Sequence, residues 1–321
     1  MTNPELVPPL MADPVSAAPT PPTNTFFRGP NGIRAGWRAL LFLVICAVQA
    51  GALVVVISLL MRGRGQAGVS MLTPLGTSLS DGTALIVMAI AALIMARIEG
   101  RRFGQYGLPL GSALGKDFWV GTFSGFLSIT ACLLGIFAFH GFHITGLALH
   151  GSMIATSTLA WAIAFVMVGL AEEFSFRGYL QFTLTTGMGF WPAALLMSAL
   201  FGLVHAGNPG ETRIGLLSVV LFGLLFCVIL RRTGNLWWCV GFHAGWDWGQ
   251  TFFYGVPDSG TAPYHNLFNS AFAGPHWLTG GSVGPEASVF TPIVLVIVAI
   301  LFTRVYRENR YPASSGSLVA A

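Results

Sequence analysis

Two adjacent carboxylates, Glu172 and Glu173, interrupt a long apolar run of this chain. A charged side chain at the centre of a bilayer costs roughly 3 kcal/mol or more unless it is paired or faces a cavity, so such residues commonly mark a functional site. Two later apolar segments carry His205 and His243, and the second also carries Asp247. Carboxylates and imidazoles can take a proton from water and stabilise developing charge. Together these residues predict a hydrolytic site inside a membrane.

The two glutamates are expected to have different roles. Neighbours on a helix point about 100° apart, so they cannot face the same partner. Glu173 and Arg177 are spaced i, i+4 on one face, where they would form a charge pair and neutralise each other. Glu172 is then the carboxylate that is free to face a cavity as a general base. The alternative is that both glutamates pair with arginines at a helix end in the headgroup region.

The histidines also allow a structural and a functional interpretation. A turn near residues 186–187 would bring Glu172 and His205 to similar depths on antiparallel helices, so we expect them to meet. A lone membrane histidine can instead simply hydrogen-bond a neighbouring helix. His243 and Asp247 are spaced i, i+4, so Asp247 would fix the tautomer of His243, or the two would satisfy each other in a polar core. Gly241 and Gly245 offer a small-residue face for close helix packing.

The amino-acid composition indicates that these residues lie in a membrane protein. The 321-residue chain is 54% hydrophobic and 9% charged, with a mean hydropathy of +0.71, whereas a soluble domain has about 25% charged residues. We predict an all-α, polytopic membrane protein, because a span needs about 20 apolar residues and several such runs occur. About eight transmembrane helices are expected, at 39–61, 75–96, 118–139, 153–185, 187–206, 214–230, 235–254 and 288–303.

The basic residues predict the orientation. The net charge of +4 could indicate nucleic acid, but the arginines flank apolar segments, so we expect no nucleic-acid partner. With both termini cytoplasmic, twelve basic residues lie inside and three outside, and Arg177 within a helix is not counted. The inner set is Arg28, Arg34, Arg38, Arg97, Arg101, Arg102, Lys116, Arg231, Arg232, Arg304, Arg307 and Arg310, and the outer set is Arg62, Arg64 and Arg213.

The chain divides into five expected regions. Residues 1–27 are rich in Pro, Ala and Thr and are expected to be a disordered tail. Residues 28–150 hold helices one to three, and residues 151–255 hold helices four to seven with the candidate site. Residues 256–310 form an outer loop and the last helix, and residues 311–321 form a C-terminal tail.

Three motifs in order resemble one known family. They are Glu172-Glu173-x-x-x-Arg177, then Phe201-x-x-x-His205, then His243-x-x-x-Asp247. This arrangement, over about residues 155 to 255, resembles the CPBP family of intramembrane proteases, which includes type II CAAX prenyl proteases and bacteriocin-processing or Abi-like immunity proteins. The resemblance implies a multi-pass protein of the cell (inner) membrane.

The resemblance also implies roles for the residues. Glu172 and His205 would activate the water that attacks a peptide carbonyl, and His243 with the residue four later would stabilise the oxyanion. The family often has Asn where this chain has Asp247, and an ionised Asp cannot donate a hydrogen bond. The implied partners are membrane lipid and a membrane-associated substrate, either a prenylated protein or a leader peptide, and the sequence specifies no oligomeric state.

Metal dependence and two other functions stay open. Glu172, His205 and His243 could supply three zinc ligands with an open position for water. The chain has no His-Glu-x-x-His pair, and one glutamate cannot easily be both ligand and base, so we favour glutamate-dependent chemistry without a cofactor over a metalloprotease. A proton- or ion-coupled transporter would use the same ionisable residues as a relay. A catalytically silent immunity or scaffold protein of the family is the third interpretation.

Overall fold

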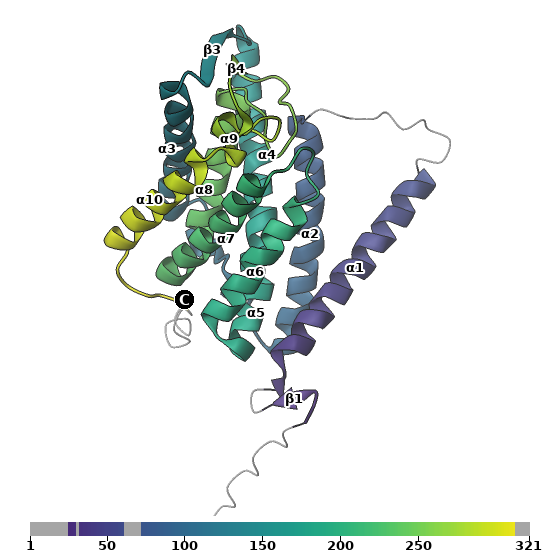
Figure 1. The fold of residues 1–321 in the computed structure, drawn as a ribbon. Helices are drawn as coiled ribbons and strands as arrows, with labels where there is room; N and C mark the ends of the chain where they lie inside the picture. Colours follow the sequence, from purple (N-terminus) through teal and green to yellow (C-terminus); the bar gives the residue numbers. More distant parts are fainter. Residues whose placement is uncertain (1–24, 30–31, 61–71, 312–321) are drawn as a thin grey trace, which may run out of the picture.

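The computed structural model describes residues 25–29, 32–60 and 72–311, and helices dominate it (Figure 1). Most of the predicted N-terminal tail, residues 312–321, and Arg62 and Arg64 lie outside the described residues. The α-helices are α1 (Ala35–Leu60), α2 (Pro74–Glu99), α3 (Lys116–Ala138), α4 (Ser152–Arg177), α5 (Tyr179–Met188), α6 (Phe190–His205), α7 (Arg213–Thr233), α8 (Trp237–Asp247), α9 (His276–Thr279) and α10 (Phe290–Val305). A π-helical segment, η3 (Trp248–Phe253), follows α8, and the short turns are η1 (Phe103–Tyr106), η2 (Leu110–Ser112) and η4 (Pro285–Ala287). The strands are β1 (Arg28–Gly29), β2 (Gly32–Ile33), β3 (Phe142–Leu147) and β4 (Phe268–Phe272).

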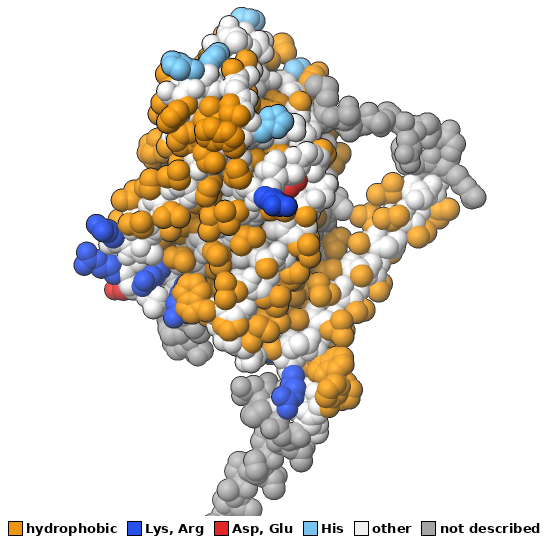
Figure 2. Space-filling model, in the orientation of Figure 1, with side chains coloured by type: hydrophobic (Ala, Val, Ile, Leu, Met, Phe, Trp, Pro, Cys, Tyr) orange, Lys and Arg blue, Asp and Glu red, His pale blue; other side chains and the backbone are white. Residues whose placement is uncertain are grey.

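The described helices have the length and surface of membrane spans. Five stretches are long and apolar enough to cross a bilayer: α1, α2, α3, α7 and the α4–α5 stretch 152–188. The helices α6 and α10 are shorter but also apolar. Large apolar side chains cover the flank of the bundle (Figure 2), and Leu159 and Val54 expose 62% and 63% of their surface. Such a surface suits contact with lipid. The protein is therefore a multi-pass, mostly helical membrane protein, while eight crossings and cytoplasmic termini stay predictions.

Local sequence signals begin α2 and α7 at one end of the bundle. Thr73 and Thr212 precede these helices, and each side-chain hydroxyl accepts a hydrogen bond from the backbone N–H three residues later. This capping supplies a partner for one of the first N–H groups of the helix. At the other end, Gly100 and Gly234 follow the two helices with φ of 64° and 77°, a left-handed conformation that favours glycine.

Glycines bring α3 and α8 into backbone contact. Gly121 and Gly125 on α3 face Gly241 and Gly245 on α8. A Cβ atom added at Gly125 or Gly245 would lie 2.0 or 2.1 Å from a main-chain oxygen of the facing helix. A side chain cannot fit at these positions, so the predicted small-residue face on α8 is confirmed.

The helix α1 is tied to the bundle at its base by a network around Glu99. This carboxylate at the end of α2 accepts hydrogen bonds from Arg38, at 3.0 Å, and from the hydroxyls of Tyr106 and Tyr179. Arg38 also donates to Thr186 of α5. Farther along, α1 diverges from the other helices (Figure 1). The buried residues of α1 are accordingly confined to its first eight positions, at Ala35, Ala39 and Phe42.

Three helix boundaries differ from those expected. The predicted fourth helix is broken at Gly178, where α4 ends and α5 begins. The turn before α6 lies at Gly189, whose φ of 84° suits glycine. Gly187 lies within α5 and packs closely against α1, where an added Cβ would lie 2.8 Å from the Cβ of Ala35. The seventh predicted helix changes to π-helical geometry after Asp247.

The loop 255–287 forms one end of the molecule with β3. Its strand β4 pairs antiparallel with β3, and the two lie above the helices (Figure 1). The same loop contains α9 and η4, and Pro263 forms an isolated bridge with Leu72 just before α2. The loop therefore reaches over the end at which α2 and α4 begin.

Candidate active site

The predicted residues line one cavity of about 360 Å³. Its walls come from α2, α4, α6, α7, α8 and the loop 255–287. The polar side chains that line it include Thr77 and Asp81 from α2, Glu172 from α4, His205 from α6, His243 and Asp247 from α8, and Asp258, Ser259, Thr261 and Glu286 from the loop. The four residues predicted to do the chemistry are thus brought together.

Glu172 lies between the two histidines. Its Oε2 atom is 3.9 Å from Nε2 of His205 and 3.7 Å from Nε2 of His243. The Glu172 side chain is 29% exposed, so it is reached by solvent within the cavity. Separations of this size are longer than a direct hydrogen bond and fit a water molecule held between the groups. The expected meeting of Glu172 with His205 is therefore seen in the structure.

A backbone carbonyl fixes the orientation of His205. The Nδ1 atom of this ring is 2.8 Å from the carbonyl oxygen of Phe201, one turn earlier on α6. A carbonyl oxygen only accepts, so Nδ1 carries the proton and donates it. In the neutral ring, Nε2 then presents a lone pair toward Glu172.

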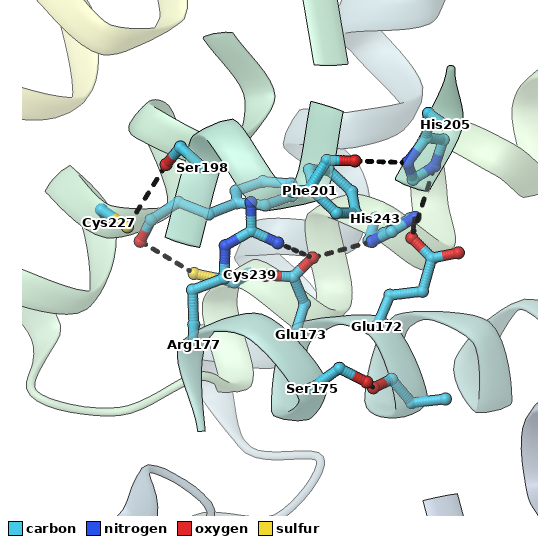
Figure 3. Close-up of polar contacts among 12 residues, drawn as sticks. Glu172, Glu173, Ser175, Arg177, Ser198, Phe201, His205, Cys227, Cys239 and His243 are labelled. Carbon is cyan, nitrogen blue, oxygen red and sulfur yellow. Dashed lines mark hydrogen bonds and ion pairs between the residues drawn. The ribbon is translucent and has the colours of Figure 1, made fainter. Parts of the chain in front are cut away.

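Glu173 holds His243 from the other side. Its Oε1 atom accepts a hydrogen bond from Nδ1 of His243 at 2.9 Å and lies 3.4 Å from Nη1 of Arg177 (Figure 3). The side chains of Glu173 and Arg177 are fully buried. The predicted pair therefore exists, but it lies in the protein core and not in a headgroup region. The carboxylate that fixes the tautomer of His243 at Nδ1 is Glu173, where the sequence had suggested Asp247.

Aromatic rings enclose the buried guanidinium. The Arg177 Cζ atom lies 4.2 Å from the ring centre of Phe201 and 5.6 Å from that of Phe226. A ring face attracts a cation, and this attraction strengthens when water is excluded. Phe201 also stacks edge-on against His205, at 4.6 Å between ring centres. The contact of Arg177 with Phe201, which lines the cavity, thus links α4 to α6.

Asp247 approaches the same nitrogen of His243 as Glu172 does. Its Oδ2 atom is 3.5 Å from Nε2 of His243, with 7% of its side chain exposed. Glu172, Glu173 and Asp247 therefore surround one imidazole. Three carboxylates at these distances favour a ring that carries protons on both nitrogens.

Two acids of the loop 255–287 were not predicted as site residues. Asp258 accepts a hydrogen bond from Thr251, and Glu286 accepts hydrogen bonds from the backbone and the hydroxyl of Ser259. Burial raises the pKa of Asp258, and burial together with the Asp258 carboxylate raises the pKa of Glu286 to about 8. A signal existed, because these are the two charged residues between positions 255 and 287.

A different set of acids among the described residues has the spacing of candidate metal ligands. One group of three candidate ligands among them has its ligand atoms within 4.8 Å of one another, and it consists of Asp247, Asp258 and Glu286. Glu172 and His205 are not in that group. Three carboxylates without histidine or cysteine form an oxygen donor set, which suits magnesium or calcium better than zinc.

The comparison with protein families identifies the same part of the chain. Residues 154–249, which span α4 to the beginning of η3, match the model of the family described as type II CAAX prenyl endopeptidase Rce1-like. No curated protein matches the chain. The match covers all six predicted site residues, from Glu172 to Asp247. Over residues 154–249, this chain is therefore similar to the Rce1-like family of type II CAAX prenyl endopeptidases.

Proposed function

We propose that the protein is an intramembrane endopeptidase in which Glu172 is the general base. The observation that carries this proposal is the position of Glu172 Oε2, within 4 Å of Nε2 of both His205 and His243, on the wall of one cavity. A general base must reach the proton it removes directly or through one water. Glu172 meets that requirement for a water bound between it and His205.

His205 positions the attacking water. With its Nδ1 proton donated to the Phe201 carbonyl, Nε2 accepts a hydrogen bond from the water. Glu172 accepts the second proton of the same water and takes it as the oxygen attacks the substrate carbonyl carbon. The attacking oxygen lone pair is thereby directed away from both protein groups and toward the substrate.

His243 supplies the positive group for the oxyanion. Glu173 accepts the Nδ1 proton, so Nε2 can donate when the ring is doubly protonated. Asp247, 3.5 Å from Nε2, stabilises that charged ring and need not donate a hydrogen bond itself. This role removes the difficulty that an aspartate replaces the asparagine common in the family.

The proton then passes to the leaving group. The tetrahedral intermediate collapses when Glu172 returns the proton to the amide nitrogen, and the C–N bond breaks to give a carboxylate and an amine. One water is consumed and no oxidant or reductant is needed. The cycle as we propose it runs without a metal or cofactor.

The substrate we propose is a peptide or lipidated protein segment that reaches the site from the membrane. The apolar flank of the bundle gives such a substrate a lipid-side approach, and lipid is the other expected partner. The proposed location is the cell membrane, with both termini in the cytoplasm. No nucleic-acid partner is proposed.

The test measures cleavage of a fluorogenic peptide library by the purified protein in detergent. Glu172→Gln and His205→Ala are each expected to lower the rate by a factor of about 10² to 10⁴, because they remove the base and the group that positions its water. Glu308→Gln is the matched control, since Glu308 is exposed and remote from the cavity. Size-exclusion chromatography of each variant must show the same single peak as the wild-type protein, so that a loss of activity is not a loss of folding.

Adding a chelator distinguishes a glutamate-based mechanism from a zinc-dependent one. Activity that survives chelation and is lost in both variants supports the glutamate-based mechanism. Loss on chelation with recovery on added zinc would make Glu172 a ligand. Failure of the wild-type protein to cleave any peptide would reject the peptidase and return attention to ion flux through the same residues.

A further inference from the structure

The active-site cavity lies at one end of the helix bundle. On α2 it is lined by Thr77 and Asp81, which lie within the first two or three turns of that helix. His205 is the last residue of α6 and Asp247 is the last residue of α8. Ser259 completes the rim from the loop 255–287. The cavity is therefore at the end at which α2 begins and α6 and α8 stop.

Basic residues gather at the opposite end. Arg38 lies near the start of α1, Arg97 near the end of α2, Lys116 at the start of α3 and Arg231 near the end of α7. Figure 2 shows Lys and Arg side chains mostly in the lower part of the molecule, at the lower left and where α1 begins, with further basic atoms higher up beside an acidic side chain, and histidines in the upper part. In the described part of the chain, the basic residue at the cavity end is Arg213. Short cytoplasmic segments carry the excess of Lys and Arg, so the cavity end is the non-cytoplasmic end.

A dry layer separates the cavity from the arginine-rich end. Glu173 and Arg177, the next residue after Glu172 and the residue one turn after Glu173, have fully buried side chains. Phe174 and Tyr179 continue this layer with 1% and 0% of their surface exposed. By contrast, Glu172 is 29% exposed and Ser259 is partly exposed. Water reaches the reacting groups from the cavity end.

We infer that water and substrate enter the cavity from the non-cytoplasmic side of the membrane. The substrate is then a segment of an exported or membrane-anchored polypeptide on that side. This inference rests on the proposed peptidase function and names its substrate class. A segment that approaches through the bundle from the arginine-rich end would meet the buried layer of Glu173 and Arg177, so the inference disfavours a prenylated C-terminus in the cytoplasm as the substrate. The hydrolysis itself is unchanged: water enters from the outer face, and the carboxylate and amine products leave there.

Cysteine labelling tests the side of the cavity without requiring activity. Ser259→Cys places a thiol at the rim, and Ala113→Cys places one at an exposed position between α2 and α3 at the arginine-rich end. Both are made in a background in which Cys46, the native cysteine that is not fully buried, is replaced by serine. We expect a membrane-impermeant maleimide to label Ser259→Cys in intact cells and Ala113→Cys after lysis alone. The reverse pattern would overturn the inference.

Cleavage in sealed vesicles tests the substrate class. A membrane-impermeant peptide that is cleaved in detergent is added to right-side-out and to inverted vesicles. We expect cleavage in the right-side-out vesicles, and none in inverted vesicles until they are permeabilised. Cleavage confined to sealed inverted vesicles would refute substrate entry from the non-cytoplasmic side but would still support the proposed peptidase activity. Absence of cleavage in detergent would refute the proposed peptidase activity. The cysteine labelling would still show to which side of the membrane the cavity opens.

Discussion

The Oε1 atom of Glu173 lies 2.9 Å from Nδ1 of His243, although the two residues are seventy positions apart and on different helices. The same carboxylate pairs with Arg177 of its own helix. One buried anion therefore serves a structural cation and a candidate catalytic ring. Variants of Glu173 and Arg177 can therefore distinguish its effect on stability from its effect on activity.

Replacement of Glu173 by glutamine should reduce both properties. The buried Arg177 would lose its counter-charge, at a cost of roughly 3 to 5 kcal/mol. Loss of the anion behind His243 should lower kcat/KM by about 10- to 100-fold. Adding Arg177→Met removes the unpaired charge, so the double variant should regain thermal stability in detergent without regaining activity. Recovery of both would show that Glu173 acts through the fold alone, and Glu308→Gln serves as the control.

The aspartate at position 247 can be exchanged for the residue common in the family. Asp247→Asn keeps the shape and can itself donate a hydrogen bond to the oxyanion, so we expect activity within about tenfold of wild type. Asp247→Leu provides neither a charge nor a donor and should lower kcat by about 100-fold. Peptide hydrolysis in detergent measures both. An asparagine variant as inactive as the leucine variant would instead show that the negative charge is required.

Adding a single methyl group between α3 and α8 should destabilise the protein. Gly125→Ala would push a Cβ atom to 2.0 Å from the carbonyl oxygen of Phe242, next to His243. Overpacking of this kind costs about 1 to 3 kcal/mol, and the displaced α8 should also lose activity. Gly51→Ala on α1 is the matched control, because nothing lies within 4 Å of that position. Unfolding midpoints in detergent should fall for the first variant and not for the second.

Stability should fall as the pH rises from about 5 to 8 because of Glu286. Its pKa of about 8 exceeds its ordinary value of 4.5, so over this range the folded protein holds a proton that the unfolded chain has lost. The stabilisation is complete at the acidic end and is lost as the pH passes through 8. Glu286→Gln should flatten this decline, leaving a smaller slope from Asp258, whose pKa is shifted in the same direction. Thermal melts from pH 5 to 9 test this, and an unchanged slope in Glu286→Gln would contradict it.

Much of the site could be predicted because it lies on regular helices. Depth along a helix can be counted, so Glu172 and His205 were expected at matching heights. The pairing of Glu173 with Arg177 follows from their spacing on one helix face. These predictions need the helix repeat and the order of the segments and little else.

The remaining contacts depend on rotation and on irregular backbone. Helix spacing says which way Glu173 points relative to Glu172, but not which neighbouring helix it meets, so its bond to His243 could not be predicted. Asp258 lies outside the helices and strands, and Glu286 lies in the three-residue turn η4, so neither belongs to an element long enough to show a repeat. Their arrival at the cavity depends on turns and on the pairing of β4 with β3, which no periodic pattern encodes.

The polar network at the base of α1 has a consequence for the order of assembly. Arg38 is among the first residues of the bundle to be synthesised, yet its partners Glu99 and Thr186 follow 61 and 148 positions later. Tyr179, which also binds Glu99, is made equally late. During synthesis α1 can therefore pack against α2 first, through the hydrogen bond from Gln49 to the Val87 carbonyl, but its docking is completed only when α5 has been made.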